Sequence, residues 1–213
     1  REFNKIFTSG RTHLKDALPI SFSDIFNGYR DMLKKDFDRI KTNEKYLNEL
    51  NIGGNAIGSG INLPKGFVGT VIKEIKSETG FAVKRAKNFF EMSQNLGDFN
   101  AYFDTIKNLA ISIYKITSDL RLYSSGPTSG INEVILPFVH AGSSMMPGKE
   151  NPSILEMSGM VCFQIFGAHT AVNYATNAGQ FQLNVMMPSV AYNILFSLEI
   201  MKNMVNALSI HCI

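Results

Sequence analysis

The groups in this chain best suited to chemistry lie in one stretch, Gly142–Pro152, which reads GSSMMPGKENP. Its glycines and prolines predict a loop, because glycine adopts backbone angles closed to other residues and proline interrupts helices and sheets. Hydroxyls and backbone N–H groups are followed by a cation and an amide, Lys149 and Asn151. Such groups can hold an anionic substrate and deprotonate it. An ordinary surface turn uses the same residue types, so composition alone leaves that interpretation open.

Two earlier blocks favour a functional loop over an ordinary surface turn. Residues 10–17 read GRTHLKDA and residues 53–62 read GGNAIGSGIN. With the loop, and in the same order, they resemble the GRTHxxDA, GGxAxGTGxN and GSSxMPxKxNP segments of the aspartase/fumarase superfamily. This resemblance implies a homotetrameric lyase that eliminates across a carbon–carbon bond to release fumarate, with each active site assembled from three subunits. We expect no cofactor and no metal.

The implied chemistry needs strong anion stabilisation. Removing a proton from the carbon next to a carboxylate builds an aci-carboxylate, which requires donors already pointing at it. By resemblance, Ser143 is the general base, and the backbone N–H groups of Ser144, Met145 and Met146 face the developing oxyanion. A serine hydroxyl is a poor base, so the same N–H groups and Lys149 would have to favour its ionised form.

The resemblance also implies roles for residues around the substrate. Lys149 anchors the other carboxylate as a point charge and Asn151 hydrogen-bonds it. Thr12 and His13 touch the two ends of the substrate, and Glu156 orients His13. Glu156 also fits a second role, as a first-turn acid favoured by the helix dipole. We interpret the remaining histidines as structural: His140, His169 and His211.

Long helices must position these groups. Apolar residues spaced by threes, fours and sevens predict helices over 22–50 and 99–123, and two more follow the loop, separated by Gly179 and Pro188. Shorter helices are expected near 68–79 and 84–95, joined by a turn at Gly80, and 124–141 reads as irregular with room for a short strand. The sequence therefore predicts an all-α, long-helix bundle. By resemblance, 1–213 is the central helical, tetramer-core domain of the family, without its N-terminal and C-terminal domains.

No Asp, Glu, Lys or Arg occurs from Met157 through Leu198. Helices without a charged face must be covered on all sides, by other helices or by membrane. Polar residues interrupt every window long enough to cross a bilayer, namely Gln164, His169, Asn173, Asn177, Gln180 and Gln182. We therefore expect these helices to form the core of a homo-oligomer and not a membrane span.

Composition and short motifs disfavour several classes of protein and binding site. Twenty-one basic and 18 acidic residues give a net charge of +3 without a dense basic run, which disfavours nucleic-acid binding. Cys162 and Cys212 fit reduced thiols and offer no metal-ligand spacing. Gly58-Ser59-Gly60 lacks the preceding strand and third glycine of a dinucleotide loop. The chain has no apolar leader with a cleavage site, and we expect a cytoplasmic protein.

Within the family, the chain resembles aspartases more than fumarases. Leu14, Asn132 and the run 179–185 fit the aspartase form, where fumarases commonly have Thr, Gly and GNFELNV. We therefore expect reversible deamination of aspartate to fumarate and ammonia, with class II fumarase as the alternative. No TxxSxxN-type segment precedes the GRTH block, so we expect a fragment that is inactive alone. A non-catalytic helical oligomer, like the lens crystallins that resemble argininosuccinate lyase, and a helical adaptor or membrane-surface protein remain as alternatives.

Overall fold

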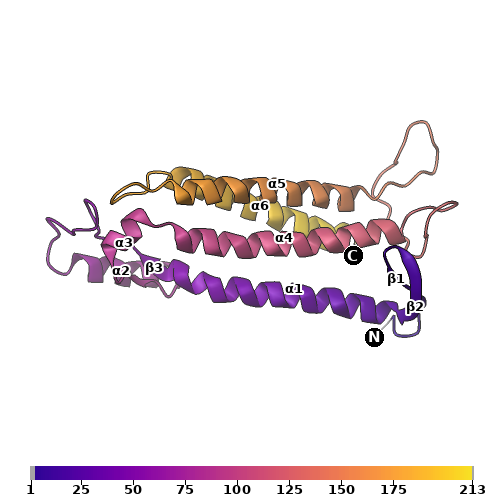
Figure 1. The fold of residues 1–213 in the computed structure, drawn as a ribbon, viewed down its shortest axis with the longest axis horizontal. Helices are drawn as coiled ribbons and strands as arrows, with labels where there is room; N and C mark the ends of the chain where they lie inside the picture. The colour runs from indigo at the N-terminus through magenta and orange to yellow at the C-terminus, as the bar shows by residue number, and fades with distance from the viewer. Residues whose placement is uncertain (1–2, 213) are drawn as a thin grey trace. The chain divides into compact units, whose positions relative to one another are not determined.

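The computed structural model describes residues 3–212, and helices dominate it (Figure 1). The expected all-α, long-helix class is confirmed, with short strands as minor additions. In chain order the elements are β1 Phe7–Thr12, β2 Lys15–Ser21, α1 Phe22–Glu44, the 3-10 helix η1 Lys45–Asn48, β3 Glu49–Leu50, α2 Phe67–Thr79, β4 Lys84–Arg85, α3 Phe89–Gln94, α4 Gly97–Tyr123, α5 Ser153–Asn177 and α6 Met187–His211.

Residue contacts divide the chain into two compact units. Unit 1 comprises Arg1–Phe37, Leu109–Phe163 and Met201–Ile213, and unit 2 comprises Asp38–Asn108 and Gln164–Ile200. Each of the four long helices α1, α4, α5 and α6 continues from one unit into the other. None of the helices within 3–212 is long and apolar enough to span a membrane.

The core of unit 1 follows the predicted helical periodicity. Ile113, Ile116 and Leu120 of α4 are buried at intervals of three and four residues, as a helix facing its neighbours requires. The rings of Tyr114 and Phe163 lie 5.1 Å apart and join α4 to α5. These contacts hold the helix ends from which the segment 124–152 departs and to which it returns.

Unit 1 also contains an antiparallel hairpin that the sequence did not predict. Strands β1 and β2 pair from Phe7↔Ser21 to Thr12↔Lys15, and His13 and Leu14 form the two-residue turn. Both have positive φ angles, 54° and 59°, as the tight turns that match strand twist require. Asn-Gly or Asp-Gly usually marks such a turn, and neither dipeptide occurs here.

Unit 2 holds the second sequence block in a compact turn. At Gly58, φ is +94° and an added Cβ would lie 2.4 Å from the backbone nitrogen of Phe90, so only glycine fits. The buried Asn184 side chain donates to the carbonyls of Ala175 and Thr176, at 3.1 Å each, and closes the connection from α5 to α6. This block therefore has a packing role within its own unit.

Three expected elements differ in the structure. The helix expected over 22–50 ends at Glu44, where η1 and β3 follow. The helix expected over 84–95 is shorter, because Lys84–Arg85 pairs in parallel with β3 and the Asn88 side chain caps α3 by accepting from Phe90 and Glu91. Residues 124–141, where a short strand was possible, contain none. By contrast α2 ends at Gly80 as expected, in the left-handed conformation that terminates many helices.

The buried histidine of unit 2 has a structural partner. The Nε2 atom of His169 lies 2.6 Å from Asp104 Oδ1, and Asn173 lies 3.3 Å from its Nδ1. This arrangement joins α4 to α5 and agrees with the structural interpretation of His169.

Candidate active site

The loop before α5 closes on itself at a narrow neck (Figure 1). The Gly142 N–H donates to the Lys149 carbonyl at 2.8 Å, and the Asn151 side-chain amide donates to the Gly142 carbonyl at 2.7 Å. A Cβ on Gly142 would lie 2.4 Å from that Lys149 oxygen, so the neck requires glycine. The shape of the loop is therefore set by contacts among its own residues.

Inside the loop, two backbone donors converge on one hydroxyl. The N–H groups of Met145 and Met146 donate to Ser143 Oγ at 3.1 and 3.2 Å. Donors directed at a hydroxyl oxygen stabilise its ionised form over its neutral form. Both groups were expected to face the substrate's oxyanion and also to favour ionised Ser143, and in this conformation they donate to Ser143. Among the described residues no acceptor takes the N–H of Ser144, which leaves that donor for a ligand.

Lys149 and Asn151 line a pocket of about 290 Å³ with the preceding segment. This volume is at the lower end of the range for small-molecule sites. Asn132, which has a left-handed φ of 51°, lines the same pocket, as does Glu150. No hydrogen bond or ion pair involves the Lys149 ammonium within the described part of the chain, so this cation is free to meet an anion.

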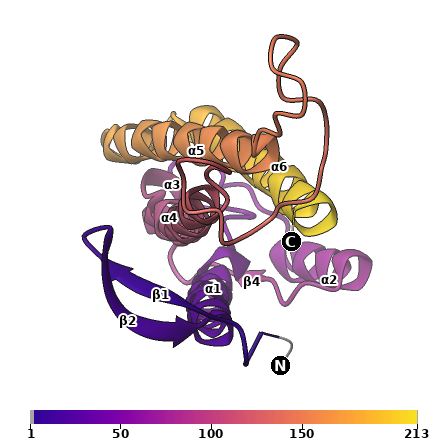
Figure 2. The ribbon, with the colours of Figure 1, turned by 90° about the vertical axis from the view of Figure 1, so that its right-hand side faces the viewer.

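The hairpin tip and the loop do not meet within one copy of the chain. Thr12 and His13 are exposed, and no hydrogen bond or ion pair of the described residues involves the His13 side chain. In the view of Figure 2, the β1–β2 tip and the loop before α5 project in different directions. Within one copy, therefore, no described contact brings His13 and Ser143 together.

Glu156 is also separate from His13 in this chain. It lies in the first turn of α5, where an acid is favoured, and its Oε1 is 3.4 Å from Nη2 of Arg121 in α4. Both side chains of this pair are substantially exposed, so the pair contributes little stability. The expected contact between Glu156 and His13 is absent within one chain.

An ion pair that sequence reasoning missed supports the hairpin. Arg11 donates to both carboxylate oxygens of Glu133, at 3.1 and 2.8 Å, and the Thr8 hydroxyl donates to Oε2 at 2.5 Å. Hydrogen bonding to Arg11 lowers the pKa of Glu133 below its usual value, and the same bond raises the pKa of Arg11. One signal was present, because Glu133 is the only Asp, Glu, Lys or Arg between Arg121 and Lys149.

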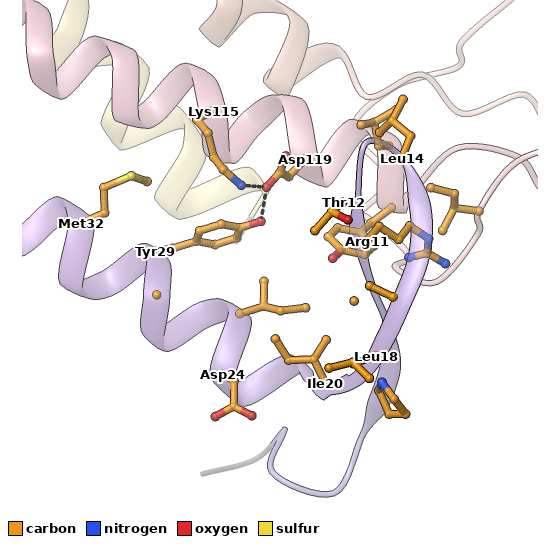
Figure 3. Close-up of a pocket in the computed structure, with 18 residues that line it drawn as sticks. Arg11, Thr12, Leu14, Leu18, Ile20, Asp24, Tyr29, Met32, Lys115 and Asp119 are labelled. Atoms are coloured by element: carbon orange, nitrogen blue, oxygen red, sulfur yellow. Dashed lines mark hydrogen bonds and ion pairs between the residues drawn. The ribbon is translucent and has the colours of Figure 1, made fainter.

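A larger cleft of about 760 Å³ lies beneath the hairpin, between β1, β2, α1 and α4 (Figure 3). Its walls are mainly apolar, and Tyr29, Lys115 and Asp119 form its polar end. The Tyr29 hydroxyl donates to Asp119 at 2.6 Å, and Lys115 forms an ion pair with the same carboxylate. Burial, then this hydrogen bond, raises the pKa of Tyr29. Neither His13 nor the loop 142–152 lines this cleft.

Comparison with known proteins gives consistent matches. A family model described as "Lyase" matches residues 1–167. An aspartate ammonia-lyase of Helicobacter pylori is 37% identical over 213 residues, which is 100% of this chain and 46% of that protein. The chain thus spans a little less than half the length of this curated relative.

Two solved structures share the fold over nearly the whole chain. A fumarate lyase:delta crystallin from Brucella melitensis superimposes with a TM-score of 0.95 at 37% identity, covering 99% of this chain and 46% of that one. A recombinant class II fumarase from Schistosoma mansoni gives a TM-score of 0.94 at 31% identity, covering 99% and 47%.

Proposed function

Because the chain belongs to the lyase family, we propose that it is the central helical domain of a protein that reversibly deaminates L-aspartate to fumarate and ammonia. One observation carries the proposal: Ser143 Oγ accepts two backbone N–H groups inside a loop that closes on itself. That arrangement supports a serine acting as a general base, which an ordinary serine hydroxyl does poorly. The similarity to an aspartate ammonia-lyase supports the choice of substrate.

In the proposed reaction the Ser143 alkoxide takes a proton from the carbon next to one carboxylate. The electrons of the broken C–H bond pass into that carboxylate to form an aci-carboxylate. They then form the carbon–carbon double bond as the C–N bond breaks and ammonia leaves with its electron pair. The N–H groups of Met145 and Met146 hold the alkoxide, while that of Ser144 is available to the substrate. Lys149 and Asn151 hold the other carboxylate.

The proposed site is shared between copies of the chain in a homotetramer. Thr12 and His13 of one copy meet Ser143 and Lys149 of another, since one copy keeps them apart. The weak, exposed contact of Glu156 with Arg121 leaves Glu156 able to orient the histidine of a neighbouring copy. Because the chain spans a little less than half the length of its aspartate ammonia-lyase relative, the proposal includes further site residues from the rest of the protein, and we expect these 213 residues alone to be inactive.

Apolar side chains on α5 and α6 support this assembly. Exposed examples in the uncharged region include Met160, Phe163, Tyr174, Tyr192 and Leu195. A surface of this kind marks a contact site more often than a free face. Light scattering of the 213-residue chain is expected to give a tetramer. A stable, well-folded monomer would contradict this part of the proposal.

Hydration of fumarate to malate is the second candidate, favoured by the similarity to a class II fumarase. Three features favour aspartate by resemblance: Leu14, Asn132 and the run 179–185. Asn132 is the most telling of these because it lines the pocket of Lys149 and Asn151. A site that binds an ammonium needs acceptors that a hydroxyl substrate would leave unpaired, so the two substrates are well separated energetically.

The test gives the full-length protein fumarate with ammonium or fumarate alone. Aspartate formed only when ammonium is present supports the proposal. Malate formed without ammonium, together with no aspartate when ammonium is added, would reverse the choice of substrate. A correctly folded tetramer that forms neither product would favour a non-catalytic member of the family.

A further inference from the structure

We propose that Glu133 is a positioning residue that fixes, through Arg11, the end of the hairpin carrying Thr12 and His13. This inference rests on the proposed function of those two residues. Glu133 itself lies outside the motif blocks, and its side chain acts on the hairpin and not on the substrate.

The contacts of Glu133 reach most of the length of β1, from Thr8 to Arg11. Its Oε2 accepts from Thr8 at 2.5 Å and from Arg11 at 3.1 Å, and its Oε1 accepts from Arg11 at 2.8 Å. Arg11 also donates to the carbonyl of Ser9 at 3.1 Å and lies 3.6 Å from Asp16 on β2. One carboxylate thus contacts β1 on both sides of the register shift between Ser9 and Arg11, at Thr8 and at Arg11, immediately before Thr12.

Few other contacts fix the orientation of the hairpin near its tip. Its base is fixed where the Phe22 N–H donates to the Ile6 carbonyl at 3.0 Å. Beyond that, β2 is exposed from Lys15 to Pro19, and Leu14 in the turn is 73% exposed. A two-stranded hairpin is marginally stable by itself, so its orientation depends on side-chain links to the rest of the unit.

Glu133 can serve as such a link because its own backbone is anchored. Its N–H donates to the carbonyl of Tyr123 at 2.8 Å, at the end of α4. The preceding Asn132 N–H donates to Ser125 at 2.8 Å. A planar guanidinium meeting a carboxylate through two parallel bonds fixes direction as well as distance. The end of α4 therefore sets the direction in which the hairpin turn points.

The experiment compares Glu133→Gln with Glu49→Gln in the full-length protein. Glu49 is a matched control in unit 2, because it pairs with Lys84 at 3.0 Å and its side chain is 24% exposed against 26% for Glu133. Hydrogen exchange of residues 7–21 is expected to rise in Glu133→Gln and to stay unchanged in Glu49→Gln. Arg11→Lys keeps the positive charge and loses the two parallel hydrogen bonds of the guanidinium, so it should also raise the hydrogen exchange of residues 7–21. Equal exchange in both glutamine variants would overturn the proposal.

Activity supplies the second readout. Glu133→Gln is expected to lower kcat by about 10-fold to 100-fold, because a misplacement of about 1 Å can cost as much. In a His13→Ala background the same change should add little, since the group being positioned is gone. Fully additive losses would contradict a positioning role. If His13→Ala alone keeps full activity, the proposed function of His13 fails, and the exchange measurement still decides whether Glu133 fixes the hairpin.

Discussion

The hairpin β1–β2 and the loop 142–152 carry motif residues of equal interest and are stabilised in different ways. The loop is closed by a backbone hydrogen bond between Gly142 and Lys149 and by the Asn151 side chain, within ten residues of sequence. The hairpin is oriented by Arg11 and Glu133, which are 122 residues apart. The loop can therefore keep its geometry wherever its neck is intact, whereas the hairpin depends on the fold of unit 1.

The largest effect is expected inside the loop. Ser143→Ala removes the proposed base and should lower kcat by about 100-fold to 10,000-fold, the range of a general base, with dicarboxylate binding retained. Lys149→Ala should instead weaken binding, because the free ammonium is the proposed anchor for a carboxylate. Steady-state kinetics and calorimetry measure the two properties. Equal loss of both properties in both variants would argue against separate roles.

A smaller effect is expected at the neck of the loop. In Gly142→Ala the new Cβ would meet the Lys149 carbonyl at 2.4 Å, so the neck must open, and kcat should fall by about 100-fold through misplacement. Gly148→Ala is the control, because its φ of 77° strains the backbone while nothing lies within 4 Å of the added carbon. The control should cost about 1–2 kcal/mol of stability with a smaller loss of kcat. Identical kinetics in the two variants would show that the neck does not shape the site.

These two regions also explain what the sequence could predict. Helical periodicity is local, so α1, α4 and α6 were located from apolar spacing, and α5 from the part of the uncharged stretch that ends at Gly179. The loop was recognised because its glycines and prolines restrict the backbone locally. Nothing local identified the hairpin, since its turn residues, His13 and Leu14, are not typical turn formers and adopt positive φ only in context.

The candidate site was also predictable only where local sequence patterns determine it. Residue types indicated which groups could do chemistry and that backbone N–H groups would have to favour ionised Ser143, and those of Met145 and Met146 donate to its Oγ. The sequence did not indicate which N–H groups of the loop donate to Ser143 and which have no acceptor. Glu133 was missed because its partner is distant in sequence. The proposed meeting of hairpin and loop between copies depends on assembly, which one chain's sequence does not describe.

The smallest effect is expected in the free energy of unfolding and its dependence on pH. The folded-state pKa of Glu133 is lowered, first by hydrogen bonding to Arg11, so its contribution is present above the unfolded-state pKa and is lost as pH falls through the folded-state pKa. Unfolding at neutral pH should show Glu133→Gln less stable than wild type by about 1 kcal/mol.

The pH series supplies its own control. The difference between wild type and Glu133→Gln should shrink once the pH drops below the usual pKa of a glutamate. The pKa of Glu49 is lowered by Lys84 in the same direction, so Glu49→Gln should follow the same trend with a smaller difference, because Lys84 is more exposed than Arg11. A difference that stays constant down to acidic pH would mean that the Arg11 ion pair does not stabilise the hairpin.

Complementation tests most directly whether hairpin and loop serve one site from different copies. His13→Ala and Ser143→Ala full-length proteins, each expected to be inactive alone, are co-expressed so that the proposed tetramers mix the two variants. The account predicts restored activity, because some sites then combine an intact hairpin from one copy with an intact loop from another. Ser143→Ala mixed with Lys149→Ala should restore none, since every loop in that mixture is damaged. Mixed tetramers of the first pair that stay inactive would contradict a site shared between copies.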